Sequence, residues 1–510
     1  MWLSHVLRRN LARDPEALAM RDPRRDVSWR EFARDVTALA AMLADAVPPG
    51  ERVAVLSGNR AEVLETYFAC TVAGVVAVPL NPGLADPEIA YILDSVAPTL
   101  ALAEGPGRER LAAGHPELPL AAIEDVADLA DAADPAGLLD RCAGLTAPVA
   151  ILHTSATTGH PKGVLVDQRS FQLNTLSWLA DVDVPGGTAF LNACPLFHGS
   201  MVIALDYLAA GATVCVLDRF TPAGCLSALQ TWRIEHAFLV PSMIRLLLES
   251  RALASTDLSA LRLVAHGAAP MPAELAEQAR AQLGVDLQTI FGITEGGGPV
   301  ISLRPGDKPG DPPVRGATCA GVPMLGTDAR IVDSRGQVAG PGEIGEIHLR
   351  GDGLMHGYWR DPGATTDVLT GGWLNTRDLG CLGADGYLWS VDRRNDLILR
   401  GGQNIYPAEI EHVLRQSPCV ADAAVVPASS TAWGQTPVAF VQPSAGSVVD
   451  EGDLIDLCVG QLAGYKRPSR FVVIDQVPRN PAGKILRRQL REQAERLTAG
   501  NPAESEEAAQ

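Results

Sequence analysis

The sequence predicts an α/β fold, with a large N-terminal domain of mixed and parallel sheets flanked by helices and a small C-terminal α+β domain. Up to about residue 270, short apolar runs alternate with segments of helical spacing, which is typical of parallel strand–helix–strand units. From about residue 315, short strands separated by Gly and Pro turns predict a small β-rich subdomain. After Asp392 the pattern changes again, and this change indicates a second domain.

The composition supports a folded protein and excludes several classes. Of the 510 residues, 47% are hydrophobic and 20% are charged, so the chain can bury a large core and is not disordered throughout. The net charge is −18 and no dense Lys/Arg cluster is present, which argues against nucleic-acid binding and requires any phosphate site to be positive locally. The nine cysteines are scattered without a CxxC pair, and they predict buried, reduced thiols.

The N-terminal segment predicts an amphipathic helix rather than a targeting or membrane segment. Residues 1–18 contain early arginines but no continuous apolar stretch, so we do not expect a signal peptide. The longest apolar run, near 70–80, is far shorter than the ~20 residues that cross a membrane. We therefore expect a cytoplasmic protein with no integral membrane segment.

The elements of the N-terminal domain are expected in the following order. Residues 28–47 have the apolar spacing of a helix, and Ser28 followed by Glu31 is the pattern of a capping box. A buried strand, a helix and a second buried strand follow over 52–58, 63–74 and 75–82. The same alternation recurs, with strands over 188–196, 212–218, 236–241 and 261–269 and helices over 201–210, 222–233 and 242–252.

The C-terminal third is expected to contain the β-rich subdomain and the small domain. Short strands are predicted over 329–333, 342–351 and 386–392. Pro407 can begin a helix, and strands over 421–428 and 436–443 and a helix over about 452–462 follow. We predict an N-terminal domain over 1–394 with its β-rich subdomain over about 315–392, a C-terminal domain over 395–496 and a disordered tail over 497–510.

A strand over 149–153 leads into a segment rich in small hydroxyl residues. Such residues, together with Gly, leave backbone N–H groups and hydroxyls free to surround phosphate oxygens, and the lysine that follows supplies a local positive charge. The segment is not the G-x-x-x-x-G-K-[ST] loop, which does not occur in the chain. The candidate phosphate-binding residues are Thr154, Ser155, Ala156, Thr157, Thr158, Gly159 and Lys162.

This segment and seven later ones, in chain order, resemble motifs of the adenylate-forming superfamily. That superfamily contains acyl- and aryl-CoA synthetases, amino-acid adenylation domains and beetle luciferases, and the resemblance covers nearly the whole chain. We identify the chain as similar to its acyl-CoA synthetase (fatty-acid–CoA ligase) type. The segments are PLFHG (195–199), HGAAPM (266–271), FGITE (291–295), WLNTRDLG (373–380), DRRNDLILRGGQNIYPAEIE (392–411), YKRP (465–468) and NPAGKILR (480–487).

The resemblance implies that a carboxylate attacks the α-phosphate of ATP, so that an acyl-adenylate forms and pyrophosphate leaves. Charge develops on the phosphates, so positive groups and donors are needed there. The implied catalytic residues are Lys484, which bridges carboxylate and phosphate, Glu295, which is also the Mg²⁺ ligand, Thr157 and His198. Thr294 is implied to join the phosphate site. The adenine and ribose are implied to lie against Ala268, Ala269, Pro270, Phe291, Gly292, Asp378 and Arg393.

The resemblance also implies a second step, in which the thiol of CoA attacks the adenylate and AMP leaves. Glycines at the CoA tunnel would let the thin pantetheine arm pass close to the backbone. The C-terminal domain is implied to rotate between the two steps about Asn395, where Asp or Lys is more usual. The implied CoA-binding residues are Gly401, Gly402, Gln403, Trp433, Tyr465 and Arg467.

The acyl pocket is predicted to take a bulky or long apolar acid. Amino-acid-activating relatives carry an aspartate that pairs with the substrate ammonium, and His198 falls at that position here, so an α-amino acid would bury an unpaired charge. Gly296–Gly298 is expected to add room. The candidate pocket residues are Phe197, His198, Gly199, Met201, His266, Gly267, Ile293 and Gly296.

Two departures from the family pattern concern the ATP site. Ala156 and Arg377 stand where Gly is usual, and weakened pyrophosphate binding would leave an enzyme that only converts a preformed acyl-adenylate into a thioester. The retained Lys484 argues against that alternative. Loading of a separate carrier protein is a second alternative, and a nucleotide-binding regulatory protein is a third. The regulatory alternative predicts loss of Lys484, Asp378 or Glu295, and all three residues are present.

The expected ligands are therefore a carboxylic acid, ATP or acyl-AMP, CoA and Mg²⁺, with no nucleic acid. The sequence leaves the identity of the acid open, and it is compatible with a homodimer.

Overall fold

The computed structural model describes residues 2–125, 144–154, 161–393, 396–401, 403–430, 433–480 and 483–499. Contacts divide the chain into two compact units. Unit 1 contains residues 1–306, 323–328 and 350–374, and unit 2 contains residues 307–322, 329–349 and 375–510. The predicted domain boundaries follow a different division, since they assign the β-rich subdomain to the N-terminal domain, and they stay a prediction.

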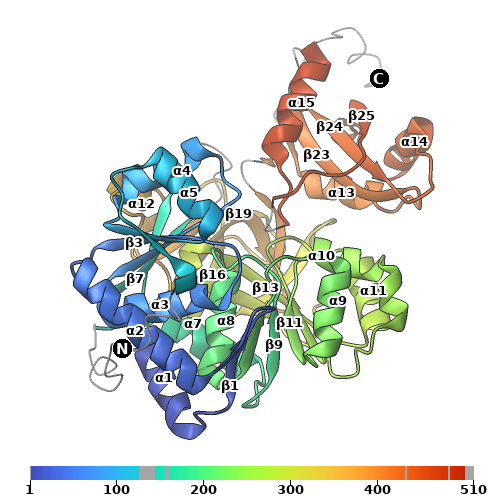
Figure 1. The fold of residues 1–510 in the computed structure, drawn as a ribbon. Helices are drawn as coiled ribbons and strands as arrows, with labels where there is room; N and C mark the ends of the chain where they lie inside the picture. Colours follow the sequence, from blue (N-terminus) through green and yellow to red (C-terminus); the bar gives the residue numbers. More distant parts are fainter. Residues whose placement is uncertain are drawn as a thin grey trace. The chain divides into compact units, whose positions relative to one another are not determined.

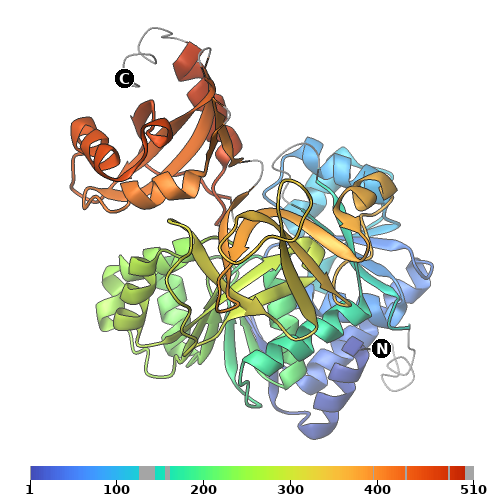
Figure 2. The same ribbon diagram turned by 180° about the vertical axis from the view of Figure 1, so that it is seen from behind.

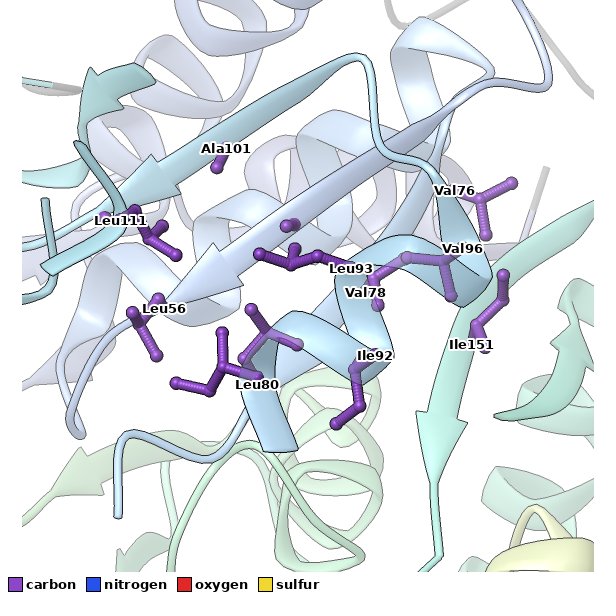
Figure 3. Packing of buried hydrophobic residues seen from close by; sticks show 13 residues of the cluster. Leu56, Val76, Val78, Leu80, Ile92, Leu93, Val96, Ala101, Leu111 and Ile151 are labelled. Carbon is purple, nitrogen blue, oxygen red and sulfur yellow. The ribbon is translucent and has the colours of Figure 1, made fainter. Parts of the chain in front are cut away.

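One sheet of unit 1 has the strand order β6-β5-β3-β4-β7-β8. Its strands run parallel except β8, which pairs antiparallel with β7. Buried aliphatic side chains of β3, β4 and β5 pack against Ile89, Ile92, Leu93 and Val96 of α4 (Figure 3). The elements of this part are β3 (Arg52–Leu56), α3 (Ala61–Ala73), β4 (Val76–Leu80), α4 (Asp86–Val96), β5 (Leu100–Ala103), α5 (Gly105–Gly114), β6 (Leu120–Ala122), β7 (Pro148–His153) and β8 (Gly163–Asp167).

The second sheet of unit 1 has the order β14-β13-β12-β11-β9-β10-β1-β2. Its strands β1 and β9–β13 are parallel, whereas β2 pairs antiparallel with β1 and β14 pairs antiparallel with β13. Helices α9, α10 and α11, drawn in green, lie together beside it in both Figure 1 and Figure 2. The strands are β1 (Leu18–Arg21), β2 (Asp26–Ser28), β9 (Ala189–Asn192), β10 (Thr213–Val216), β11 (His236–Phe238), β12 (Leu263–His266), β13 (Asp286–Ile293) and β14 (Gly298–Leu303).

The remaining helices of unit 1 connect and cover these strands. They are α1 (Trp2–Arg13), α2 (Trp29–Ala46), α7 (Gln168–Asp181), α8 (Ser200–Ala210), α9 (Pro222–Thr231), α10 (Pro241–Leu248), η2 (Arg251–Ser255), α11 (Ala273–Leu283), η3 (Thr294–Gly296) and α12 (Pro362–Val368), with the short strand β18 (Leu369–Thr370). Within the described ranges, no helix combines the length and apolar character that a bilayer-spanning segment requires.

The part of unit 2 before the C-terminal domain is β-rich, as predicted. Its strand β20 pairs antiparallel with both β15 and β19. The strands of this region are β15 (Thr318–Pro323), β16 (Thr327–Val332), β17 (Gly345–Gly351), β19 (Trp373–Leu382) and β20 (Leu388–Arg393), although the ends of β15, β16, β17 and β19 extend into segments of unit 1.

The C-terminal part of unit 2 is a five-stranded sheet covered on both faces. Strands β22, β21, β24 and β23 follow one another, and β25 pairs with β24. Along β23, Ala423 and Val425 pack against α13 and α14, while Ala424 and Val426 pack against α15 (Figure 1). Burial on both faces explains why residues 423–428 of this strand form a continuous apolar run. The elements are β21 (Ile398–Arg400), β22 (Gln403–Ile405), α13 (Pro407–Leu414), β23 (Val420–Ser430), β24 (Gly434–Pro443), α14 (Glu451–Gln461), η5 (Gly464–Lys466), β25 (Arg470–Val473) and α15 (Arg487–Ala499).

Several local predictions are confirmed. Ser28 caps α2, and the side chain of Glu31 accepts from the backbone N–H of Ser28, which completes the capping box. Pro407 is the first residue of α13. The cysteines of the described segments are all free, and most of them are buried. Burial raises the pKa of Cys70, Cys194, Cys215 and Cys225 to about 12.

Candidate active site

The carboxyl ends of parallel strands bring three predicted motifs to one edge of the second sheet of unit 1. The PLFHG loop follows β9, the HGAAPM turn follows β12, and FGITE ends β13 and enters η3. Because β9, β11, β12 and β13 run parallel, these segments lie at the same edge, where α/β sheets bind their ligands. The topology therefore brings these three motifs to one edge of the sheet.

The predicted adenine-side turn requires an unusual backbone. Gly267 lies so close to β13 that a Cβ atom built on it would stand 2.5 Å from the carbonyl oxygen of Ile290. Ala268 adopts a φ of 65°, which is in the left-handed region. The side chain of Phe291 is half-buried on β13, and Ala269 is half-buried after the turn. Backbone shape, more than side-chain chemistry, thus defines this side of the candidate nucleotide site.

Tyr358 contacts two residues that the sequence predicts for the phosphate side of the site. Its hydroxyl donates to Oε1 of Glu295 at 2.7 Å, and the Nζ of Lys162 lies 4.9 Å from the centre of its ring. The backbone N–H of Met355 donates to the carbonyl of Glu295 at 2.9 Å. A cation over an aromatic face is attracted by the ring quadrupole. One tyrosine therefore joins the predicted metal ligand to the predicted phosphate-binding lysine.

The position of Lys162 is set by the β7–β8 hairpin. The backbone N–H of Thr154 donates to the carbonyl of Lys162 at 3.0 Å, and the N–H of Lys162 donates to Oγ1 of Thr154 at 3.2 Å. The N–H of Trp359 donates to the carbonyl of Gly163 at 2.7 Å, which fastens the segment of Tyr358 to β8. The predicted residues Ser155, Ala156, Thr157, Thr158 and Gly159 lie outside the described residues.

Glu295 fits a magnesium ion that arrives with a nucleotide. Mg²⁺ is bound through one or two carboxylates, with phosphate oxygens and water completing its shell. Within the described ranges, no group of three or more His, Cys, Asp or Glu side chains could hold a metal by itself. The carboxylate of Glu295, close to the predicted phosphate-binding Lys162, fits an ion whose other ligands are phosphate oxygens and water.

Tyr358 was not among the residues predicted from the sequence. Its only local signal is the GYW string at 357–359, and an aromatic residue in such a string ordinarily indicates packing. The segment is separated from Lys162 and Glu295 by many residues along the chain, so the contact depends on the tertiary fold.

The predicted ribose residues are neighbours within unit 2. Asp378 on β19 is directly opposite Arg393 on β20 in the antiparallel register. Asp378 is buried, and its N–H donates to Oγ1 of Thr376 at 3.1 Å. Arg377, which stands where the family pattern has Gly, is exposed and has a φ of 62°. The chain therefore keeps the left-handed backbone that a glycine would adopt without strain.

The acyl-pocket candidates differ in how much surface they present. Phe197 and His198 are half-buried and Gly199 is exposed, all in the loop after β9. Met201 is completely buried on α8. His266 is also buried, and its Nε2 lies 3.1 Å from Oγ1 of Thr289. Burial lowers the pKa of His266 to about 4, so the ring is neutral at physiological pH. The pocket roles of Met201 and His266 remain predictions.

The glycines at Gly296–Gly298 lie in a packed turn. A Cβ atom on Gly296 would stand 2.8 Å from Cγ1 of Val300, and one on Gly298 would stand 2.9 Å from Cγ1 of Val202. Gly297 has a φ of 70°. These glycines therefore permit a tight turn against packed neighbours, and the expectation that they add room to the acyl pocket stays a prediction.

The predicted CoA-binding residues gather around Arg400 in unit 2. The N–H of Gly401 donates to the carbonyl of Trp433 at 2.9 Å, and the guanidinium of Arg400 lies 5.7 Å from the centre of the indole ring. Nη1 of Arg400 donates to the carbonyl of Tyr465 at 3.0 Å and to that of Arg467 at 3.3 Å. Arg400 was not predicted, and it is the residue that brings the three sequence segments together.

Other predicted residues of this region can be placed only in part. Gln403 is exposed at the start of β22. Gly402 and the predicted hinge residue Asn395 lie outside the described residues, and so does the side chain of Arg393. Lys484 follows a short loop in which its N–H donates to Oδ1 of Asn480 at 2.9 Å.

Comparison with known proteins identifies the family. Residues 7–359 match the model of the AMP-binding enzymes, and residues 409–484 match the model of the AMP-binding enzyme C-terminal domain. The chain therefore belongs to the AMP-binding enzyme family. Within it, the chain is of the AMP-forming acyl-CoA ligase type, as the sequence predicted.

Three relatives illustrate this assignment. The chain is 35% identical to a feruloyl-CoA synthase of Amycolatopsis sp, over 94% of this chain and 96% of that protein. It is 36% identical to the fatty acid–[acyl-carrier-protein] ligase ScoC of Streptomyces coeruleorubidus, over 92% of each. Among solved structures, the o-succinylbenzoate CoA synthetase of Bacillus subtilis in complex with its acyl-adenylate superimposes with a TM-score of 0.84, at 29% identity and over 95% of this chain and 97% of that one.

Proposed function

We propose that this protein activates a bulky apolar carboxylic acid with ATP and transfers the acyl group to the thiol of CoA. In the first step a carboxylate oxygen bonds to the α-phosphorus, and the bond to pyrophosphate breaks. In the second step the sulfur bonds to the acyl carbonyl carbon, the thiol loses its proton, and AMP leaves with the electrons of the broken bond. The arrangement of Lys162, Tyr358 and Glu295 carries this proposal, because it combines a positive charge and a metal-binding carboxylate.

The residues of the chain divide the work as follows. Lys162 attracts the phosphates, and Lys484 stabilises the charge that develops on the carboxylate and the α-phosphate. Asp378 accepts from the ribose hydroxyls. Magnesium held by Glu295 would neutralise charge on the phosphates.

The acid is proposed to carry a large apolar or aromatic group. Phe197 and Ile293, both partly exposed, border the expected pocket, and no carboxylate in the PLFHG loop pairs with an ammonium group. The named substrates of the relatives are in accord with this class, since feruloyl and o-succinylbenzoyl groups are aromatic. The fatty acid–carrier-protein relative makes a carrier protein the competing acceptor. The exposed ring of Trp433, with the guanidinium of Arg400 5.7 Å from its centre, favours free CoA, because the nucleotide end of CoA offers an adenine ring and phosphates that the arm of a carrier protein lacks.

A paired assay tests the proposal. Exchange of labelled pyrophosphate into ATP with a panel of aryl and alkyl acids measures adenylation, and release of AMP from synthetic acyl-adenylates in the presence of CoA measures thioester formation. The expected result is both activities with at least one apolar acid. Thioester formation without exchange would show a protein that uses only preformed acyl-adenylates. If neither activity is detected with any acid, the proposal that this protein is an acyl-CoA ligase is refuted.

The same assay tests the division of labour. Lys484→Ala should reduce exchange by about 10²–10³-fold, as expected for the loss of one donor to the transition state, and should leave thioester formation intact. An equal loss of both activities would contradict the role of Lys484. Replacing CoA by a phosphopantetheinylated carrier protein tests the acceptor, and faster transfer to the carrier would overturn the assignment of CoA.

A further inference from the structure

The loop that carries Lys484 is closed by its own hydrogen bonds. The N–H of Asn480 donates to the carbonyl of Lys484 at 2.9 Å, and the N–H of Gly483 donates to the carbonyl of Asn480 at 2.8 Å. Arg479 and Ile485 form an antiparallel bridge. Gly483 has a φ of 79°, which a residue with a Cβ atom adopts only under strain. Backbone contacts therefore join the described residues directly before and after positions 481–482, and Lys484 is one of them.

The side chain of Arg479 fastens this loop to the sheet. Its Nη1 donates to the carbonyl of Gly483 at 2.8 Å, and its Nη2 donates to Oδ2 of Asp422 at 2.7 Å. Asp422 is buried on β23, a strand covered by helices on both faces. A guanidinium can make both contacts at once because its donors are held in one plane. Gly483, the residue next to Lys484, is thereby tied through Arg479 to a strand that is buried on both faces.

Alternating charges continue from Asp422 through the domain. Nε of Arg415 lies 3.4 Å from Oδ1 of Asp422, and its Nη2 lies 3.2 Å from Oε2 of Glu411. Oε1 of Glu411 accepts from Nη1 of Arg487 at 2.7 Å. Burial would raise the pKa of Glu411, but the positive charges of Arg487 and Arg415 outweigh it and lower the pKa. The acid is therefore ionised, and the pairing is between full charges.

The run of charges ends beside the predicted hinge. Nε of Arg487 lies 3.4 Å from Oδ2 of Asp396, and Nη2 of Arg491 donates to Oδ1 of Asp396 at 2.6 Å. Asp396 follows the predicted hinge residue directly in the sequence. The loop of Lys484 and the first described residue after the hinge position are thus connected by charged contacts within one body.

We propose that Arg479 is a positioning residue for Lys484 in the adenylation step, held in place by Asp422. This inference rests on the role of Lys484 in the proposed function. Arg479 acts through the loop and does not need to contact a substrate. Displacing a catalytic group by about 1 Å can reduce a rate by about 10²-fold. Loss of Arg479 therefore affects the step that uses Lys484 and spares the step that does not.

The test compares the two half-reactions in variants of the full chain. Arg479→Ala should lower the maximal rate of pyrophosphate exchange by about 10–100-fold, with the KM for ATP unchanged and thioester formation from acyl-adenylate within about twofold of the wild type. Asp422→Asn should produce a smaller loss of the same kind. Arg488→Ala is the matched control, because Arg488 is an exposed arginine in the same domain whose pair with Glu492 spans 3.9 Å. It should change neither half-reaction.

Two further measurements separate positioning from general damage to the fold. Guanidinium added at low millimolar concentration should partly restore exchange in Arg479→Ala, and Arg479→Lys should retain more exchange than Arg479→Ala. In a Lys484→Ala background, Arg479→Ala should cause no additional loss of exchange.

The outcomes distinguish this proposal from the proposed function. If Lys484→Ala abolishes exchange while Arg479→Ala leaves it unchanged, the positioning role is refuted and the proposed function stands. If Arg479→Ala reduces both half-reactions equally, or lowers exchange further in the Lys484→Ala background, the positioning role is refuted. Arg479 then contributes only to the stability of the fold. If Lys484→Ala itself leaves exchange intact, the proposed function fails first.

Discussion

Replacing Arg377 by Gly is expected to stabilise the protein relative to replacing it by Ala. Arg377 has a φ of 62°, and its N–H donates to Oδ1 of Asn375 at 2.8 Å, so the turn is held in the left-handed region. A residue with a Cβ atom pays roughly 1–2 kcal/mol for that conformation. Glycine avoids this cost but loses roughly 0.5–1 kcal/mol more chain entropy on folding.

The balance favours the Gly variant by about 0.5–1 kcal/mol. For a folding unit of 150–250 residues, about 1 kcal/mol corresponds to about 2–4 °C in melting temperature. We therefore expect Arg377→Gly to melt about 1–4 °C above Arg377→Ala in differential scanning calorimetry. Both variants lack the guanidinium, so the difference between them measures the backbone alone.

A position with an ordinary backbone is the control for this comparison. Val473 is exposed on β25 and is not among the residues with positive φ. There the Gly variant should melt below the Ala variant, because only the entropy cost of Gly remains. If Arg377→Ala melts at or above Arg377→Gly, the strain argument is wrong.

Three other predictions follow from the site. Tyr358→Phe removes the hydrogen bond to Glu295. It should raise the Mg²⁺ concentration needed for half-maximal pyrophosphate exchange by roughly 5–10-fold, which corresponds to about 1 kcal/mol. An unchanged Mg²⁺ titration, or unchanged Mn²⁺ binding followed by electron paramagnetic resonance, would contradict this prediction, and Tyr387→Phe serves as the control. Gly267→Ala places a Cβ atom against the carbonyl of Ile290 and should cost about 1–3 kcal/mol of stability, seen as a lower melting temperature; a variant as stable as the wild type would mean that the turn can move. The pKa of His266 is about 4 in the folded protein and about 6.5 in the unfolded chain. Between these two pH values the unfolded chain binds a proton that the folded protein does not bind. The free energy of unfolding therefore falls as the pH decreases from about 6.5 to about 4. The loss of melting temperature between pH 7 and pH 5 should be smaller in His266→Asn, and an equal loss would refute this assignment.

Local signals predicted the elements well because each depends on neighbouring residues. Ser28 and Glu31 complete a capping box within one turn, and Pro407 begins α13 because a proline has no N–H to leave unpaired there. The apolar run over 421–428 predicted a strand, and β23 occupies that position. The alternation of apolar runs and helical segments predicted parallel strand–helix–strand units, and β9, β11, β12 and β13 pair in parallel.

Contacts between distant segments could not be predicted from these signals. Tyr358, Arg400 and Arg479 each join segments far apart in the chain, and nothing in their local sequence distinguishes them from a packed aromatic residue or a surface arginine. The surroundings of Gly296 also depend on the tertiary fold. A missing side chain leaves room only if no neighbour fills it, and Val300 fills it. Glycine content alone therefore does not report pocket size.

The burial of the cysteines has a practical consequence for measuring the proposed reaction. A thiolate, not a thiol, reacts with electrophilic reagents. Burial raises the pKa of Cys319, Cys381 and Cys458 to about 11, and it raises the pKa of Cys70, Cys194, Cys215 and Cys225 to about 12. These seven side chains are protonated at neutral pH. A colorimetric reagent that reacts with thiolates should therefore report the consumption of the CoA thiol with little contribution from these seven cysteines.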